Sequence, residues 1–284
     1  MDLHASAERL GGIDGLDRIA GPAAKAVKRA VGPGRLKDLV SGSWLGHPLH
    51  PLLTDIPIGS FTSATVLDLL AGRRGENAAD VLVTVGLLSA LPTAAAGAAD
   101  WSDTYGPEQR VGVVHALSNV VGLGFYAASL RARRRGRRGA GTALALAGMT
   151  SMSVGGYLGG YLSYSRGVGV NNAFWQNGPD KWTAVLTEAE LTEGKSTKVE
   201  VAGATALLYR SNGKIYAIGS RCSHAGGPLE EGAVDEAACT VQCPWHQSVF
   251  SLDSGSVAHG PASVPQAAYD VQVQDGQIEI RHRP

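Results

Sequence analysis

The chain is poor in cysteine and has no net charge. Its 284 residues include three cysteines, which are too few for a disulfide scaffold. The 25 basic and 25 acidic residues cancel, so no overall positive field points to a nucleic-acid partner. Apolar residues crowd the region 51–165, and the length leaves room for two domains of different character.

The N-terminal region, residues 1–46, lacks the apolar core of a signal peptide. It is instead an amphipathic stretch, interrupted by glycine, with seven lysines and arginines. This composition favours short helices that lie on a membrane surface. A disordered tail is the alternative.

Four apolar stretches follow and predict a four-helix transmembrane bundle over residues 47–166. A helix that spans a bilayer needs about 20 mostly apolar residues. The expected spans are residues 51–72, 81–99, 111–130 and 139–165. The first span is the weakest, because Asp55 and Asp68 interrupt it near its two ends. The alternative is a soluble protein with one buried core helix for each run.

The sequence from Trp44 to about Asn171 resembles a family of small four-helix bacterial membrane domains that has no assigned function. The resemblance rests on the H-P-L-H-P motif at residues 47–51 and covers nearly half of the chain. It implies a topology for this region and little of its chemistry.

Polar and ionisable residues of this region gather at one end of the expected bundle, because the first and third helices run in the same direction. They are His47, His50, Asp55, His115 and Asn119. Ionisable groups at membrane depth are costly and often mark a site or a pathway. The group is either a structural brace, a site for a quinone or a proton relay, or a haem site.

Two short motifs rich in metal ligands lie between residues 222 and 246. Each of them, Cys222-x-His224 and Cys243-x-x-His246, carries one thiolate and one imidazole. A zinc site is one interpretation, although zinc motifs usually pair like residues within one turn. If the thiolates bind one metal and the imidazoles another, each turn supplies one ligand to each of two adjacent metals. An iron pair bridged by sulfide needs this arrangement.

The two motifs resemble the ligand loops of the Rieske [2Fe-2S] family, in which two histidines replace two cysteines on one iron. Gly226 and Pro244 fit such loops, since glycine permits close backbone approach and proline fixes a turn. The resemblance extends over residues 181–284, where Pro261 matches the loop that covers the cluster. It implies that the cluster and metal ligands are Cys222, His224, Cys243 and His246.

The same C-terminal region predicts an all-β antiparallel sandwich, joined to the bundle by a linker over residues 167–180. Short alternating runs begin at Trp182, and Asn212-Gly213 and Asp275-Gly276 are hairpin dipeptides. Cys239 falls in one of the expected strands and is expected to be buried. The whole chain is therefore expected to be a multidomain α + β protein.

The resemblance also bears on the reduction potential. Respiratory Rieske proteins join their two ligand loops by a disulfide, and the corresponding positions here are Gly227 and Trp245. This difference implies the ferredoxin-like branch of the family. Ser248 matches a serine whose hydroxyl raises the reduction potential of respiratory Rieske proteins. Phe250 replaces their tyrosine, which supplies a second hydroxyl. An intermediate potential is therefore expected.

The chain is expected to carry electrons rather than to catalyse a reaction by itself. Only 38 residues follow His246, which leaves no room for the mononuclear-iron domain of a Rieske oxygenase. The expected partner is a reductase, an oxygenase or a respiratory component, and no catalytic residue is assigned. The alternatives are a quinone- or haem-linked oxidoreductase subunit that uses His47, His50 and His115, and a redox sensor.

The distribution of basic residues suggests an orientation in the cell membrane. Eight arginines lie in the first and third loops of the expected bundle, against Arg35, Lys37, Arg110 and Arg166 on the other side. The excess favours arginine loops in the cytoplasm and an extracytoplasmic β domain. Counting the whole N-terminal region brings the two sides close to parity.

Overall fold

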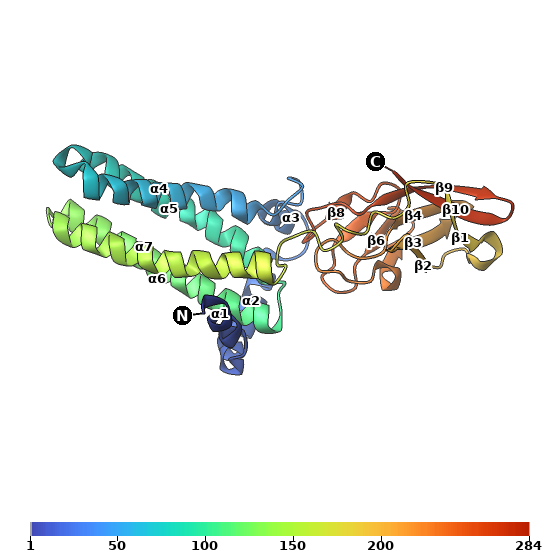
Figure 1. The fold of residues 1–284 in the computed structure, drawn as a ribbon, viewed down its shortest axis with the longest axis horizontal. Coiled ribbons are helices and arrows are strands. Elements are labelled where there is room, and N and C mark those ends of the chain that lie inside the picture. The colour runs from blue at the N-terminus through green and yellow to red at the C-terminus, as the bar shows by residue number, and fades with distance from the viewer. Residues whose placement is uncertain (1, 284) are drawn as a thin grey trace. The chain divides into compact units, whose positions relative to one another are not determined.

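The computed structural model describes residues 2–283, which divide into two units. The helical unit contains the residues up to Val31 together with Leu49–Val168 (Figure 1). The β unit contains Gly32–Pro48 and the chain from Gly169 onward. The helical N-terminal region and the β-rich C-terminal region match the predicted order.

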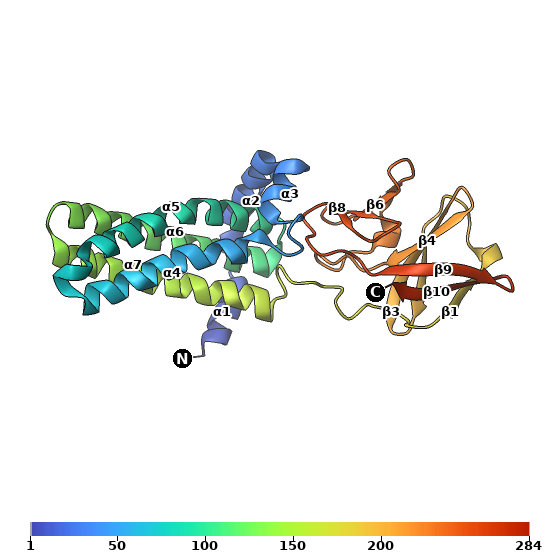
Figure 2. The ribbon, with the colours of Figure 1, turned by 90° about the horizontal axis from the view of Figure 1, so that it is seen from above.

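Four long helices make up most of the helical unit. They are α4 (Leu49–Leu70), α5 (Glu76–Trp101), α6 (Gly106–Arg134) and α7 (Arg138–Gly160). A short π-helical turn, Tyr161–Ser165, continues the last of them. Helix α4 packs mainly on α5 and α6 mainly on α7, and both views show the helices running alongside one another (Figures 1 and 2).

Two helical segments have the length and composition needed to cross a membrane, namely Gly72–Trp101 and Gly106–Arg134. Helices α4 and α7 are also long, but α4 contains Asp55 and Asp68, and α7 is rich in glycine, serine and threonine. The four helices overlap the four apolar stretches of the sequence. The crossing of a bilayer by all four of them stays a prediction.

A buried ionic network joins the four long helices. Asp68 of α4, Asp80 of α5, Arg133 of α6 and Arg138 of α7 form ion pairs with one another. The Arg133 side chain is fully buried and lies beside the buried Asp68 carboxylate. Arg138 donates to Asp80 at 2.7 Å. Each of the two deeply buried charges is thus paired, which such burial requires.

The N-terminal residues form helices in the structure. Helix α1 (Leu3–Gly11) and helix α2 (Asp17–Val31) flank a 3₁₀ turn over Asp14–Leu16. Arg110 of α6 pairs with Asp14 at 2.6 Å and with Asp17 at 2.7 Å. These contacts hold the two helices on the long bundle, so the described part of this region is ordered by packing.

The β unit contains two antiparallel sheets and one short helix, α3 (Arg35–Ser41). One sheet has the strand order β1-β10-β9-β4-β3-β2 and the other β5-β6-β7-β8. The strands are β1 (Thr183–Thr187), β2 (Thr197–Val201), β3 (Ala204–Ser211), β4 (Lys214–Gly219), β5 (Ala233–Asp235), β6 (Thr240–Gln242), β7 (Val249–Ser251), β8 (Val257–His259), β9 (Ala268–Gln274) and β10 (Gln277–Arg283). The predicted antiparallel sandwich is confirmed.

The two predicted hairpin turns are also present. Asn212-Gly213 joins β3 to β4, and Asp275-Gly276 joins β9 to β10. All four residues have positive φ, between 51° and 75°, as a tight two-residue hairpin turn with both central residues left-handed demands.

Cys239 corrects one expectation. It lies in a turn between β5 and β6, with φ of 53°, and is only half-buried. The strand expected there is interrupted because Asp235 accepts a hydrogen bond from the backbone N–H of Ala238 and closes the turn. The other two cysteines belong to the core of the sandwich.

Candidate metal centre

The first ligand loop follows strand β4 and closes on itself through its backbone. The Cys222 N–H donates to the Gly227 carbonyl at 2.8 Å, and the Gly226 N–H donates to the Cys222 carbonyl at 2.7 Å. Gly226 has φ of 78°, a conformation that favours glycine. This tight loop places Cys222 toward the core and leaves His224 partly exposed.

The second ligand loop connects β6 to β7 in a similar way. The Cys243 N–H donates to the Ser248 carbonyl at 2.8 Å, and the Gln247 N–H donates to the Cys243 carbonyl at 3.1 Å. Pro244 is exposed in this turn, directly after the buried Cys243. His246 is partly exposed, as is His224 in the first loop.

The two loops bring the four predicted ligands together. Cys222 and Cys243 are each 1% exposed and share one core cluster. The rings of His224 and His246 have centroids 4.8 Å apart and planes at 81°. Buried thiols therefore lie on the core side of the site, and the imidazoles lie on its solvent side.

The two thiols are hydrogen-bonded to each other. A hydrogen bond from Cys222, helped by the backbone N–H groups of Trp245 and His246, lowers the pKa of Cys243 to about 6. The same hydrogen bond, together with burial, raises the pKa of Cys222. Metal binding requires both thiols to lose their protons, so a bound cluster would take the place of this hydrogen bond.

The donor set fits an iron pair. A [2Fe-2S] cluster asks for only two protein ligands on each iron, and the site offers two sulfur and two nitrogen donors in separate layers.

Glycine at position 227 is required by the second loop. A Cβ atom there would lie 2.8 Å from the Cys243 sulfur and 3.1 Å from the Trp245 ring. Gly227 and Trp245 are the positions where respiratory Rieske proteins would place a disulfide, and the three cysteines of this chain are free. At these two positions the loops pack closely against each other and are not joined by a disulfide.

Ser248 joins the second ligand loop to the segment that follows β8 and contains Pro261. The Ser248 hydroxyl oxygen accepts a hydrogen bond from the Ala262 N–H at 2.9 Å, and Ser248 is fully buried. Its own hydrogen remains able to donate. Phe250 is also fully buried and belongs to the core rather than to a polar network.

Two polar residues that contact this site, Asp38 and Asn172, had no signal in the sequence. Asp38 of α3 accepts from the Gly260 N–H at 2.8 Å and lies 2.9 Å from the His259 ring nitrogen. Both views show α3 beside the end of β8 (Figures 1 and 2). Asn172, from the predicted linker, donates to the His224 carbonyl at 2.8 Å. Neither residue belongs to a motif, so only the fold identifies it.

The structure brings together three of the five residues predicted to form a site in the bundle. His50 of α4 and His115 of α6 have ring centroids 6.4 Å apart. The Asn119 amide nitrogen lies 3.3 Å from His115 Nε2. Asp55 is exposed on α4, and His47 belongs to the β unit, where its ring contacts the Pro48 carbonyl.

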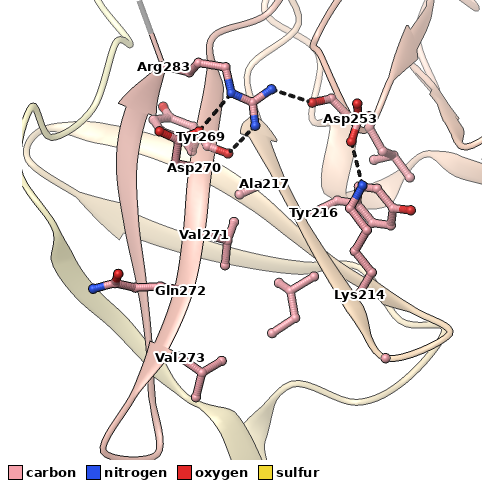
Figure 3. A pocket seen from close by; sticks show the side chains of 13 residues that line it. Lys214, Tyr216, Ala217, Asp253, Tyr269, Asp270, Val271, Gln272, Val273 and Arg283 are labelled. Atoms are coloured by element: carbon pink, nitrogen blue, oxygen red, sulfur yellow. Dashed lines mark hydrogen bonds and ion pairs between the residues drawn. The ribbon is translucent and has the colours of Figure 1, made fainter.

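The β unit also has an open pocket of about 390 Å³ that contains none of the predicted ligands. Ion pairs between Lys214 and Asp253 and between Arg283 and Asp270 lie at its rim (Figure 3). Its floor consists largely of strand residues from β4 and β9. These charges are already paired, so the pocket is a salt-bridged depression and not the metal centre.

Two families match this chain over separate ranges. Residues 181–270 match the Rieske [2Fe-2S] domain. Residues 46–172 match a family described as "predicted membrane protein (DUF2231)". Neither description mentions haem or quinone, so those cofactors stay a prediction from the sequence.

Characterised relatives resemble the β unit. The chain is 38% identical over 96 residues to the 3-phenylpropionate/cinnamic acid dioxygenase ferredoxin subunit of Photorhabdus laumondii, which is 34% of this chain and 90% of that protein. It is 36% identical over 92 residues to the Escherichia coli K12 subunit of the same name, which is 32% of this chain and 85% of that protein.

Solved structures give a further comparison. The ferredoxin of carbazole 1,9a-dioxygenase from Nocardioides aromaticivorans IC177 is 29% identical, with a TM-score of 0.35, and the match covers 36% of this chain and 99% of that one. The dioxygenase ferredoxin relatives and the family matches show that the chain belongs to the Rieske [2Fe-2S] family as a ferredoxin-type electron carrier, fused to a helical domain of the predicted membrane protein family.

Proposed function

We propose that Cys222 and Cys243 bind one iron of the cluster and that His224 and His246 bind the other. The convergence of the two loops, with thiols on the core side and imidazoles on the solvent side, carries this assignment. When bound, the cluster accepts and donates one electron at a time. The protein's own contribution is to hold the ligands, exclude water from the sulfur side and donate hydrogen bonds.

The imidazole side is the proposed route for electrons. His246 is partly exposed, and its neighbour Trp245 is 56% exposed. Pro244 and Gln247 are exposed as well, so a surface on the second ligand loop surrounds this histidine. An exposed aromatic ring beside a redox ligand suits a protein partner that docks briefly.

The proposed partners are a reductase that supplies electrons and an oxygenase or respiratory component that receives them. The relatives named above are ferredoxin subunits of a dioxygenase, which supports this class of partner. In this proposal the chain passes electrons on, and catalysis on an organic substrate takes place in the partner.

The helical unit is proposed to anchor the carrier in a membrane with α4, α5, α6 and α7 as spans. Two segments meet the length and composition of a span, and the matching family is described as a membrane protein. The arginines of the first and third loops favour a cytoplasmic position for those loops and an extracytoplasmic β unit. Attachment of a fluorophore to single cysteines in each loop of whole cells would establish the side.

Spectroscopy of the purified full-length chain tests the carrier function. We expect the rhombic EPR signal of a Rieske centre after reduction with dithionite, and rapid transfer of electrons from a ferredoxin reductase with NADH to cytochrome c. An EPR-silent protein with intact β structure would sink the ligand assignment. A redox sensor, in contrast, would give the EPR signal but transfer electrons no faster than the reductase alone.

A further inference from the structure

His50 and His115 form a second pair of imidazoles, inside the helical unit and separate from the proposed cluster ligands. They come from different helix pairs, His50 from α4 beside α5 and His115 from α6 beside α7. Their ring centroids are 6.4 Å apart and their planes are nearly perpendicular, at 82°. Two imidazoles that meet in this way between packed helices need a chemical explanation.

The hydrogen bonds of the two rings fix their tautomers. His50 Nδ1 lies 2.9 Å from the Thr93 carbonyl, and His115 Nδ1 lies 2.7 Å from the Gly155 carbonyl. A backbone carbonyl can only accept, so both Nδ1 atoms carry the hydrogen in the neutral rings. The lone pair of each neutral ring is therefore on Nε2, as in metal-binding histidines that donate their other N–H to a backbone carbonyl.

The separation of the rings matches two imidazoles on opposite sides of one metal ion. On each side of the metal, a metal–nitrogen bond of about 2 Å and about 1.1 Å from that nitrogen to the ring centre add to about 3.1 Å. Two rings on opposite sides therefore have centroids roughly 6.2 Å apart. The observed distance is 6.4 Å. The Asn119 amide nitrogen lies 3.3 Å from His115 Nε2, and a metal bound to this nitrogen would take the place of that contact.

Each ring packs against a glycine on the helix that also accepts its hydrogen bond. A Cβ atom at Gly97 would lie 2.6 Å from His50, and one at Gly159 would lie 3.1 Å from His115. Nearby, Pro57 lacks an N–H and leaves the Leu53 carbonyl without its helical donor. The Thr93 hydroxyl donates to that carbonyl at 3.1 Å, which fixes α4 against α5 beside His50.

We propose that His50 and His115 are the two protein ligands of one metal centre in the helical unit. The described residues offer no third histidine, cysteine or carboxylate to complete a group around one ion. A metal held by two imidazoles alone must have its other positions filled by something else. A bare ion completed by water and a metal carried by a planar macrocycle would both be held by the same two imidazoles.

Metal analysis of the full-length chain in detergent tests the proposal without any assay of activity. Acid-labile sulfide measures the cluster, so metal in excess of one iron per sulfide belongs to a second centre. We expect about one additional metal per chain, with a Soret band and sharp visible bands for a macrocycle, or without them for a bare ion. Metal equal to sulfide in a membrane-extracted, folded protein would overturn the proposal.

Substitution of each ligand then assigns the centre. His50→Ala and His115→Ala should each lower the second metal by at least about tenfold and leave sulfide unchanged. His47→Ala is the matched control from the same H-P-L-H-P motif, and its metal content should equal that of the wild type. Loss of metal in the control alone, or retention in both variants, would also overturn the proposal.

Glycine variants provide a second test that leaves both histidines in place. Gly159→Ala should displace the His115 ring and shift or weaken the spectrum of the second metal. Gly156→Ala is its control in α7, because a Cβ atom at Gly156 has nothing within 4 Å. Equal spectra for the two variants, with both folded by circular dichroism, would count against a metal at the ring.

Discussion

The two units of the protein each bring a pair of histidine rings together, by different means. In the β unit the rings of His224 and His246 are 4.8 Å apart and stand on two loops. In the helical unit the rings of His50 and His115 are 6.4 Å apart and stand on two helices. The planes are nearly perpendicular in both pairs, at 81° and 82°.

The two pairs differ in the other potential ligands that lie beside the histidine rings. Each loop of the β unit also supplies a cysteine, so two short turns offer four ligands for two irons. In the helical unit, α4 and α6 each supply one histidine and no thiol. A backbone carbonyl of a neighbouring helix fixes each ring. The two loops thus bring four potential ligands together, whereas the faces of α4 and α6 bring together two.

The first way to test this comparison is to remove a thiol. Cys243→Ser should abolish the cluster, because hydroxyl oxygen is a poor ligand for iron–sulfur chemistry. Iron, sulfide and EPR measurements should fall to background. Cys239→Ser is the matched control, since Cys239 lies in a turn outside the ligand loops, and it should retain the full signal.

A second test asks whether the two units are stable independently. Asp68→Asn leaves the fully buried Arg133 without its nearest carboxylate, which should destabilise the helical unit by about 3 to 5 kcal/mol. Unfolding followed by circular dichroism in detergent measures this loss, while the EPR signal of the cluster should stay unchanged. A parallel loss of the EPR signal would show that the units unfold together.

The control for that test is a surface pair. Lys214 and Asp253 are 60% and 59% exposed, so Asp253→Asn should change stability by less than about 1 kcal/mol. A larger change would mean that their ion pair contributes more to the sandwich than its exposure suggests.

A third test concerns the hydrogen bonds around the cluster ligands. Ser248→Ala should lower the reduction potential by roughly 40 to 90 mV, since a hydrogen bond worth about 1 to 2 kcal/mol converts at about 59 mV for each 1.4 kcal/mol. Redox titration followed by EPR measures the shift. Ser248→Thr keeps the hydroxyl and should retain most of the potential, so equal shifts in both variants would assign the effect to packing.

The smallest expected effect is on helix α3. Asp38→Ala removes both contacts to His259 and Gly260, and amide exchange in residues 32–48 should rise by about 5- to 30-fold. Asp38→Asn keeps an oxygen for the Gly260 N–H and should show a smaller rise. Unchanged exchange in both variants would mean that α3 is held by other contacts.

The four residues proposed as cluster ligands come from local patterns in the sequence. Cys222 and His224 are two residues apart, and Cys243 and His246 are three apart, so each pair is positioned by a single turn. The hairpins at Asn212-Gly213 and Asp275-Gly276 are equally local, because positive φ at two successive residues is a property of those residues. The strand expected around Cys239 is interrupted, because the Asp235 carboxylate accepts a hydrogen bond from the Ala238 N–H and closes a turn there.

Such local patterns could not predict contacts between residues that are far apart in the chain. Asp38 and His259 are 221 positions apart, and nothing in either neighbourhood indicates the other. From the direction of the helices alone, we predicted that one end of the bundle would contain His47, His50, Asp55, His115 and Asn119. It could not tell which faces of the helices meet.

The sequence by itself therefore determined the cofactor class, because ligand identity and short spacing suffice to recognise a site built from two turns. It also determined the change from helices to strands, through the period of the apolar residues. Tertiary structure decided that His50 meets His115 without His47 or Asp55, and that Asp38 reaches the loop after β8. Those contacts depend on helix rotation and long-range packing, which no local spacing encodes.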